Sequence, residues 1–209
     1  EAARADYLAN IVPGPCPGPV DMGQIIVWLK ENLPTNSILT NGAGNFSQWA
    51  TRFYPYRPWR TQLAPINGAM GYGVPSGIAA KLVNPHRTVV TFSGDGDFLM
   101  TGQELATAIQ YNAPVIFIVV NNSMYGTIRM HQERDYPARV HGTALQNPDF
   151  AALARAYGAL GETVETTEQF APAFQRAMAA GKPALIEVTL DPEAITTRTT
   201  LSAIRNRMK

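Results

Sequence analysis

The sequence lacks the features of a disulfide-bonded, membrane-spanning or polyanion-binding protein. Its 209 residues include one cysteine, Cys16, so neither an intrachain disulfide nor a multi-cysteine zinc cluster can form. The 17 basic residues nearly balance the 16 acidic ones, and a net charge of +1 gives no basic surface for nucleic acid or an anionic membrane. The longest apolar runs, such as residues 115–120, are far shorter than the roughly 20 residues that a membrane helix needs.

The composition that remains is that of a well-packed globular domain. Hydrophobic residues make up 45% of the chain and charged residues only 16%, so we expect much of the chain to be buried. The length is that of one domain, or of one large domain with tails. No segment has the pattern of a signal or transit peptide, and we therefore predict a cytoplasmic protein.

The two ends of the chain differ in composition from its middle. The chain starts at Glu1 without an initiator methionine, and residues 12–19 are almost entirely proline and glycine, which is typical of a stiff extended connector. We therefore expect residues 1–20 to be a connector from a preceding region that is absent from the chain. Residues 21–192 are expected to form the domain, and residues 193–209 a basic, solvated tail.

Within the domain, short apolar strands alternate with helices. The pattern predicts strands at 37–40, 88–92, 115–120, 160–164 and 184–190, and helices at 21–33, 47–53, 102–111, 148–157 and 167–180, with another that ends near residue 82. A long polar loop is expected over residues 121–146. Because the strands are apolar on both faces, they indicate an α/β fold, with a doubly wound, mostly parallel sheet of about five or six strands and helices on both faces.

The segments that carry chemistry follow two consecutive strands. In an open α/β sheet the ligand lies beyond the carboxyl ends of the strands, where Gly94-Asp95-Gly96 and Asn121-Asn122 are found. Glycines leave backbone N–H groups open to an anion, while a carboxylate and an amide oxygen suit a hard ion such as Mg²⁺ or Ca²⁺. The 24 residues 97–120 between the two turns are enough for one helix and one returning strand. The two turns should therefore face each other and share a divalent ion bound to a diphosphate.

These two turns and their spacing resemble the thiamin-diphosphate-binding motif of thiamin-diphosphate-dependent enzymes. The chain is most similar to the C-terminal, diphosphate-binding domain of the acetolactate synthase/pyruvate decarboxylase group. Residues 68–75, 103–108 and 147–154 also resemble that domain, and the similarity extends from about Pro19 to Leu190. The resemblance implies a thiamin-diphosphate- and Mg²⁺-binding domain of a 2-keto acid decarboxylase or carboligase, most like acetolactate synthase.

The resemblance also implies individual roles. Asp95, the side chain of Asn122 and the backbone oxygen of Met124 would coordinate Mg²⁺, for which Ca²⁺ could substitute. The diphosphate would be contacted by Asn45, Gly94, Gly96, Asp97, Tyr125 and Gly126. The carbonyl of Gly68 would accept a hydrogen bond from the 4′-amino group of the aminopyrimidine. Met70 would hold the cofactor bent, so that this amino group lies next to the thiazolium C2. Taken alone, Met70 is better explained as a residue that fills the core.

Two further expectations concern charge and completeness. A second carboxylate near a diphosphate is repulsive, so Asp97 should point away from the diphosphate or cap the following helix. The glutamate that contacts the pyrimidine N1′ in this family lies on a separate pyrimidine-binding domain, and nothing in the 209 residues resembles that domain. The resemblance therefore implies that this domain comes from the same parent chain or from a partner subunit. It also implies a homo-oligomer, dimeric or tetrameric, that acts on a small 2-keto acid.

The sequence also allows other hypotheses about the function of the chain. The chain could be a non-catalytic cofactor-binding module or one subunit of a split decarboxylase. A nicotinamide-binding Rossmann domain would use residues 42–44, but Ser47 occupies the position of the third glycine and residues 60–67 contain no acidic residue. No Gly-x-Ser-x-Gly segment supports a serine hydrolase. His131 and His141 either reach a substrate carboxylate or carbonyl, or belong to a solvated loop.

Overall fold

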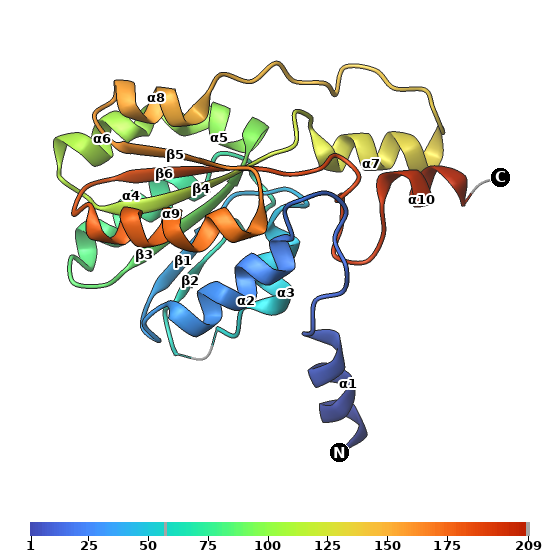
Figure 1. Ribbon diagram of the computed structural model, residues 1–209, viewed down its shortest axis with the longest axis horizontal. Coiled ribbons are helices and arrows are strands. Elements are labelled where there is room, and N and C mark those ends of the chain that lie inside the picture. Colours follow the sequence, from blue (N-terminus) through green and yellow to red (C-terminus); the bar gives the residue numbers. More distant parts are fainter. Residues whose placement is uncertain (57, 208–209) are drawn as a thin grey trace.

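The apolar strands assemble into one parallel sheet in a computed structural model that describes residues 1–56 and 58–207. The strand order is β2-β1-β3-β4-β6-β5, and every neighbouring pair is parallel (Figure 1). The strands are β1 (Ile38–Asn41), β2 (Gln62–Leu63), β3 (Val89–Gly94), β4 (Val115–Asn121), β5 (Leu160–Val164) and β6 (Ala184–Thr189). The predicted α/β fold with a doubly wound parallel sheet is therefore confirmed, and β2, two residues long, is the strand that the sequence pattern did not reveal.

Helices cover both faces of this sheet (Figure 1). The helices on one face are α2 (Met22–Asn32), α3 (Ser47–Phe53) and α9 (Thr167–Ala179). Those on the other face are α4 (Gly73–Val83), α5 (Asp95–Thr101), α6 (Leu105–Gln110, after the 3₁₀ turn Gly102–Glu104) and α8 (Phe150–Ala156). The sheet thus forms the middle of three layers, with a hydrophobic cluster on each side.

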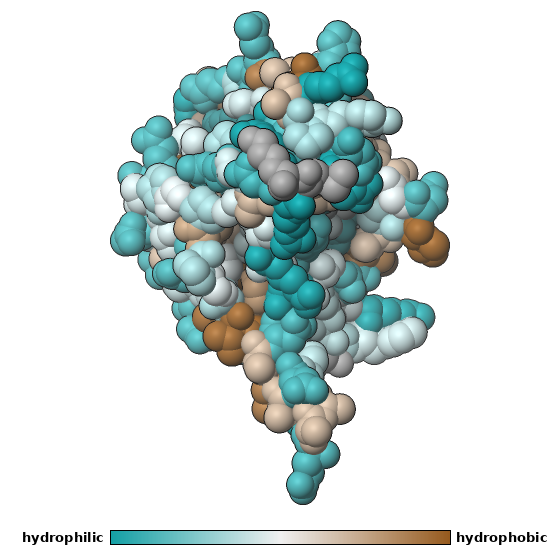
Figure 2. All heavy atoms as spheres, turned by 90° about the vertical axis from the view of Figure 1, so that its right-hand side faces the viewer, coloured by the Kyte–Doolittle hydropathy of each residue, from teal (hydrophilic) through white to brown (hydrophobic). Residues whose placement is uncertain are grey.

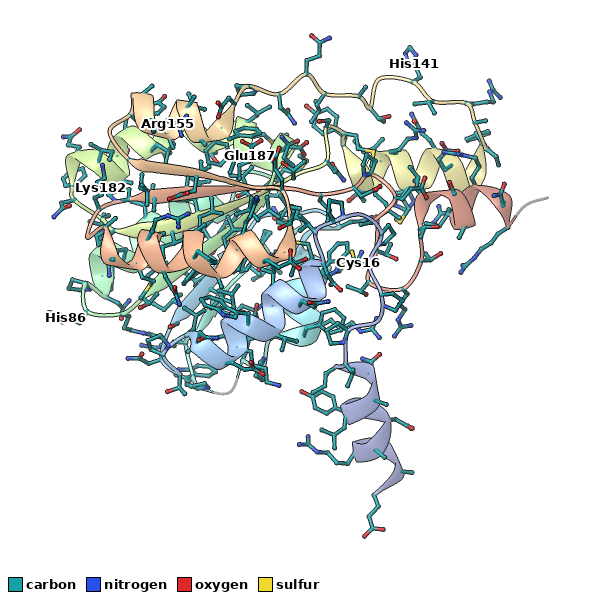
Figure 3. The ribbon with its side chains drawn as sticks, viewed as in Figure 1. Cys16, His86, His141, Arg155, Lys182 and Glu187 are labelled. Atoms are coloured by element: carbon teal, nitrogen blue, oxygen red, sulfur yellow. The ribbon has the colours of Figure 1, made fainter. Side chains whose placement is uncertain are left out.

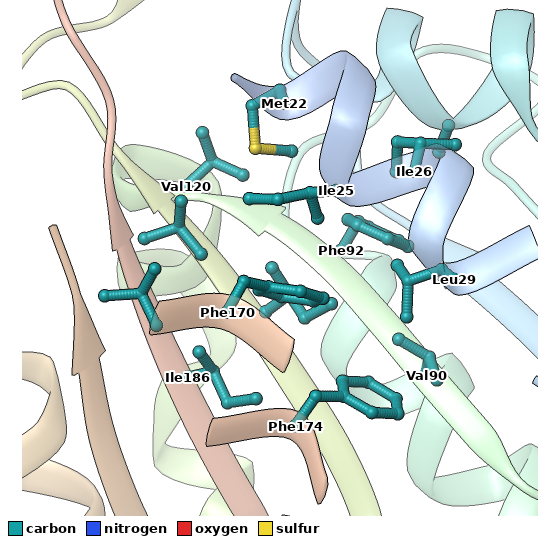
Figure 4. Packing of buried hydrophobic residues seen from close by; sticks show 14 of the residues in the cluster. Met22, Ile25, Ile26, Leu29, Val90, Phe92, Val120, Phe170, Phe174 and Ile186 are labelled. Carbon is teal, nitrogen blue, oxygen red and sulfur yellow. The ribbon is translucent and has the colours of Figure 1, made fainter. Parts of the chain in front are cut away.

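Strand β4 shows why both faces are apolar. Its successive side chains point to opposite faces, so Ile118 joins the cluster beneath α2 and α9 while Phe117 joins the one beneath α4 and α8. In the first cluster Phe170 and Phe174 of α9 pack over the sheet beside α2 (Figure 4). Fully burying one such side chain stabilises the fold by roughly 1.5–3 kcal/mol. The central strands are therefore firmly held, and so are the turns at their carboxyl ends.

Side-chain caps fix where several helices begin. Asp21 accepts a hydrogen bond from the Gln24 amide at the start of α2, as the sequence predicts. Asp149 caps α8 by accepting from the Ala152 amide, so this helix starts two residues later than its predicted start at residue 148. These caps hold the loops that precede the helices in defined positions.

Two helices occupy segments predicted to be irregular. The expected polar loop 121–146 contains α7 (Gly126–Asp135). The expected solvated tail contains α10 (Leu201–Asn206), which packs against α7. Both predictions were wrong, because Leu201 and Ile204 of α10 form a third apolar cluster with Met124 and Ile195. Residues 208–209 of the predicted tail lie outside the described residues.

A smaller correction concerns the turn after β3. The helix expected to begin at residue 102 is preceded by α5, which starts at Asp95 immediately after the strand. Asp95 and Asp97 therefore lie in the first turn of a helix rather than in an extended loop.

The N-terminal residues lie outside the packed layers. Helix α1 (Ala2–Asn10) has no buried residue and projects from the body of the molecule (Figures 1 and 2). Residues 12–20 have no regular secondary structure, as their proline and glycine content predicts. Among the helices of the described residues, none has the length and apolar character needed to cross a membrane.

Candidate functional site

The carboxyl ends of β1, β3 and β4 border one pocket of about 230 Å³. All the residues to which the sequence assigns a role line this pocket: Asn45, Gly68, Met70, Gly94, Asp95, Gly96, Asp97, Asn122, Met124, Tyr125 and Gly126. The structure adds lining residues that the sequence did not single out: Ala43, Gly44, Phe46, Trp49, Val120, Thr127, Ile128, Leu190, Ala194 and Ile195. The pocket therefore joins the strand ends to α7 and to the segment after β6.

Asp95 is a buried carboxylate that faces the turn after β4. Its Oδ1 accepts from the Gly96 amide at 2.9 Å, and its Oδ2 accepts from Asn147 Nδ2 at 2.8 Å. Burial raises the pKa of Asp95, and hydrogen bonds, including those from the amides of Ser123 and Met124, partly offset this effect. The carboxyl group thus lies beside the residue 122–124 turn, as the spacing of the two motifs predicts.

No cationic side chain within the described parts of the chain forms an ion pair with Asp95. A buried carboxylate without a compensating charge is unfavourable in a protein interior. At the same edge, Asn122 and Met124 line the pocket and bring an amide and a backbone carbonyl. In residues 1–56 and 58–207 no three His, Cys, Asp or Glu side chains are grouped to hold a metal, so an ion here would need these neutral oxygens. This donor set fits Mg²⁺ or Ca²⁺.

The walls beside Asp95 are closely packed around glycine. A Cβ atom on Gly94 would lie 2.8 Å from a ring carbon of Phe46, and one on Gly96 would lie 2.5 Å from a ring carbon of Tyr125. A side chain at either position would displace these rings, so both positions favour glycine, and both line the pocket. We call the turn that carries Gly94 and Gly96 the glycine cradle.

Helix α7 begins at this cradle, a feature that the sequence analysis missed. Gly126, Thr127 and Ile128 form its first turn and line the pocket, and no side chain caps this end of the helix. Free first-turn amides attract anions. The sequence does contain one signal for this helix, because Arg129 and Glu133 have the i,i+4 spacing of a helical ion pair. In the structure, Arg129 Nη2 lies 2.8 Å from Glu133 Oε1.

The carboxylate of Asp97 is held by backbone amides. Its Oδ1 accepts from Gly71 N at 2.8 Å and from Ala43 N at 3.2 Å. Burial raises the pKa of Asp97, and these hydrogen bonds partly offset the increase. The side chain does not cap α5, because that helix has no side-chain cap. Asp97 instead joins the turn after β1 to the turn that carries Gly68 and Met70.

The Gly68–Gly71 turn reaches the pocket through left-handed backbone. Gly68 has φ +70° and Gly71 φ +80°, values that side chains other than glycine rarely allow. The Gly71 carbonyl accepts from Thr101 Oγ1 at 2.9 Å, so both the N–H and the C=O of Gly71 are bonded to side chains of α5. Met70 lines the pocket and is only partly buried, which distinguishes it from core packing.

Asn45 lines the pocket and also links two segments that border it. Asn45 Nδ2 donates to the Ile195 carbonyl at 3.0 Å and its Oδ1 accepts from Thr127 Oγ1 at 3.1 Å, so this side chain links α7 to the C-terminal segment. Its contact with a diphosphate stays a prediction.

His131 and His141 are exposed and do not line the pocket, and His141 points away from the strand ends (Figure 3).

A doubly wound parallel sheet with a pocket at its strand ends, a carboxylate buried without an ion pair among the described residues, and an uncapped helix start are together typical of a cofactor-binding α/β domain. A comparison of the sequence with known protein families identifies the domain more narrowly. Residues 42–188 match the family described as "Thiamine pyrophosphate enzyme, C-terminal TPP binding domain", and the chain belongs to this family.

Two acetolactate synthase large subunits are similar to this chain. The chain is 32% identical over 174 residues to a probable acetolactate synthase large subunit of Methanocaldococcus jannaschii, covering 82% of this chain and 29% of that protein. It is 31% identical over 169 residues to the acetolactate synthase isozyme 2 large subunit of Escherichia coli, covering 80% of this chain and 31% of that protein. The chain thus spans about 30% of the length of these relatives.

A solved structure shares the fold. It is the thiamine diphosphate-dependent 4-hydroxybenzoylformate decarboxylase of Rhodococcus jostii RHA1, which aligns with a TM-score of 0.79 and 30% identity. The alignment covers 86% of this chain and 34% of the decarboxylase. The chain is therefore similar to the cofactor-binding domain of acetolactate synthase-like enzymes.

Proposed function

We propose that this chain is the thiamin-diphosphate- and Mg²⁺-binding part of an enzyme that decarboxylates a small 2-keto acid or joins it to a second carbonyl compound, as an acetolactate synthase does. The observation that carries the proposal is the Asp95 carboxylate, which is buried, forms no ion pair within residues 1–56 and 58–207, and faces the Asn122–Met124 turn. When bound, thiamin diphosphate supplies the carbanion chemistry for breaking a bond next to a keto carbon. The names of the relatives support this reaction class.

Each part of the pocket would hold a different part of the cofactor. Asp95, the Asn122 side chain and the Met124 carbonyl would hold Mg²⁺, or Ca²⁺ in its place. The diphosphate would lie against backbone amides of residues 94–97 and 125–126, all of which line the pocket. The Gly68 carbonyl and the Met70 side chain would hold the pyrimidine end and keep its amino group close to the reacting carbon.

A complete active site would need a second domain. The glutamate expected at the pyrimidine ring has no counterpart in this sequence. Apolar side chains are also exposed beside the pocket: Met100 is 49% exposed and lies against Gly71, and Leu99 is 45% exposed. Exposed apolar surface of this kind favours association. We propose a pyrimidine-binding domain, from the same parent chain or a partner subunit, within a homo-oligomer.

The test is calorimetric titration of thiamin diphosphate into the whole protein that contains residues 1–209, with and without Mg²⁺. Binding should require the metal, and Asp95→Ala should weaken it at least about 100-fold, because a direct ligand should matter no less than the outer-shell groups that cost 10–100-fold. Asp135→Ala removes an exposed carboxylate at the far end of α7 and should leave the affinity unchanged. Equal binding without metal, or by Asp95→Ala, would contradict the proposal.

A further inference from the structure

Asn147 connects the two turns that border the pocket. Its Nδ2 donates to Asp95 Oδ2 at 2.8 Å and to Asn121 Oδ1 at 2.8 Å. Asn121 Oδ1 also accepts from the Ser123 amide at 3.0 Å, and Asn121 Nδ2 donates to Glu187 Oε1 at 2.7 Å. Glu187 belongs to β6, where Figure 3 shows it within the sheet. One hydrogen-bonded chain therefore runs from the sheet to the carboxylate that faces the pocket.

The direction of these hydrogen bonds is fixed by chemistry. Asn147 Nδ2 lies between two oxygens, both of which can only accept, so it must be the amide nitrogen that faces them. The opposite orientation would place an oxygen against the Asp95 carboxylate. Asn147 Oδ1 is buried and has no hydrogen-bond partner in the described residues, so both side-chain hydrogen bonds of Asn147 are made by Nδ2.

The backbone presents Asn147 from a rigid support. Pro148 follows it and restricts its backbone to extended conformations. Helix α8 begins at Phe150 and packs against β5 and β6, which fixes the position of the segment that precedes it. The side chain of Asn147 is consequently held by the folded body of the domain, independently of α5 and of the turn that carry the pocket residues.

We infer that Asn147 is a positioning residue for the metal: it fixes the rotation of the Asp95 carboxylate and keeps it in register with the 121–124 turn. The inference rests on the proposed function. With Oδ2 held by Asn147 and Oδ1 held by the Gly96 amide, the carboxylate cannot turn away from Asn122 and Met124 when no ion is bound. Groups that orient metal ligands in this way typically account for 10–100-fold in metal affinity.

Binding of Mn²⁺, followed by its electron paramagnetic resonance signal at saturating thiamin diphosphate, tests this role in the whole protein that contains residues 1–209. Asn147→Leu keeps the approximate size of the side chain and removes both donors, and Asn147→Ala is the smaller alternative if the leucine variant fails to fold. Either variant should raise the Mn²⁺ dissociation constant 10–100-fold. At saturating metal, bound cofactor should return to the wild-type amount.

Asp149→Ala is the matched control, because it removes the α8 cap two residues away without touching Asp95. It should lower the melting temperature and leave Mn²⁺ affinity near the wild-type value. Unchanged Mn²⁺ affinity in both Asn147 variants, or an equal loss in Asp149→Ala, would overturn the inference while the proposed function stands. If the unmodified protein binds thiamin diphosphate without any metal dependence, the proposed function itself fails.

Discussion

Two acidic residues of a single helical turn, Asp95 and Asp97, differ in what they contact. Both are buried, and burial raises the pKa of each. Asp95 faces the turn after β4, whereas Asp97 accepts from amides of Gly71 and Ala43, which lie 26 and 54 residues away in the sequence. A motif of adjacent residues identifies the pair, but such distant partners cannot be read from local sequence. The sequence therefore predicted that the Asp97 side chain would point away from the diphosphate, but it did not predict which backbone amides bind it.

Two replacements of Asp97 distinguish how much its hydrogen bonds and its negative charge each contribute to the free energy of unfolding. Asp97→Ala leaves the Gly71 and Ala43 amides without their acceptor and should destabilise the fold by about 2–4 kcal/mol. Asp97→Asn keeps an oxygen for both amides, and its new amide can donate to the oxygen of the nearby Ser93 hydroxyl. It should cost less than about 1 kcal/mol. Denaturant unfolding measures both, and equal losses would show that the negative charge, rather than its hydrogen bonds, holds the two turns.

At the scale of elements, α7 and α10 are held together by a buried charge. Glu133 of α7 is 1% exposed, and its carboxylate pairs with Arg205 of α10 at 2.7 Å and with Arg129 at 2.8 Å. The Arg205 hydrogen bond is the largest cause that lowers the pKa of Glu133 from 4.5 to about 2. The buried residue of α7 is thus an acid rather than an apolar side chain. Hydrophobic periodicity consequently fails to detect this helix, and the segment was predicted to be a loop.

The lowered pKa of Glu133 predicts how its contribution depends on pH. A carboxyl group whose pKa falls on folding stabilises the protein fully above its ordinary value of 4.5, and this stabilisation is lost as the pH falls towards about 2. Glu133→Gln should therefore lower the free energy of unfolding by about 1.5–3 kcal/mol near pH 7. The difference from the unmodified protein should shrink steadily below pH 4.5.

Denaturant unfolding at several pH values measures this difference. Asp135→Asn, which alters an exposed pair with Arg134, should have little effect at any pH. A Glu133→Gln difference that is independent of pH would mean that shape rather than charge is responsible.

At the scale of the whole molecule, the chain has a complete core and an incomplete site. Hydrophobic clusters on both faces of the sheet are closed by the chain's own helices. This part of the fold was predictable, because alternating apolar strands and helices leave few arrangements. The packing of α10 on α7 was not, because it depends on a small cluster and an ion pair between segments 72 residues apart. Beside the Gly68–Gly71 turn, Leu99 and Met100 of α5 remain 45% and 49% exposed.

A completed core and an incomplete site predict separable activities. The 209-residue chain alone should fold and bind thiamin diphosphate with Mg²⁺, yet release no CO₂ from pyruvate, because the glutamate that we propose for the pyrimidine ring would come from a second domain. The whole protein with its pyrimidine-binding domain should release CO₂. A coupled assay of CO₂ release on equal amounts of bound cofactor makes the comparison. Turnover by the chain alone would show that one of its own acids performs the activation.

One wall of the pocket comes from a segment beyond the matched family region. Residues 42–188 correspond to the family domain, whereas Leu190, Ala194 and Ile195 line the pocket after that region ends. Asp95, Asn122 and Met124 lie within the matched region, while this wall is built from a short segment that the Asn45 side-chain amide holds through the Ile195 carbonyl. Substitutions in this segment would change the shape of the pocket without altering the sheet, and so would change which ligand fits while the residues at the strand ends stay the same.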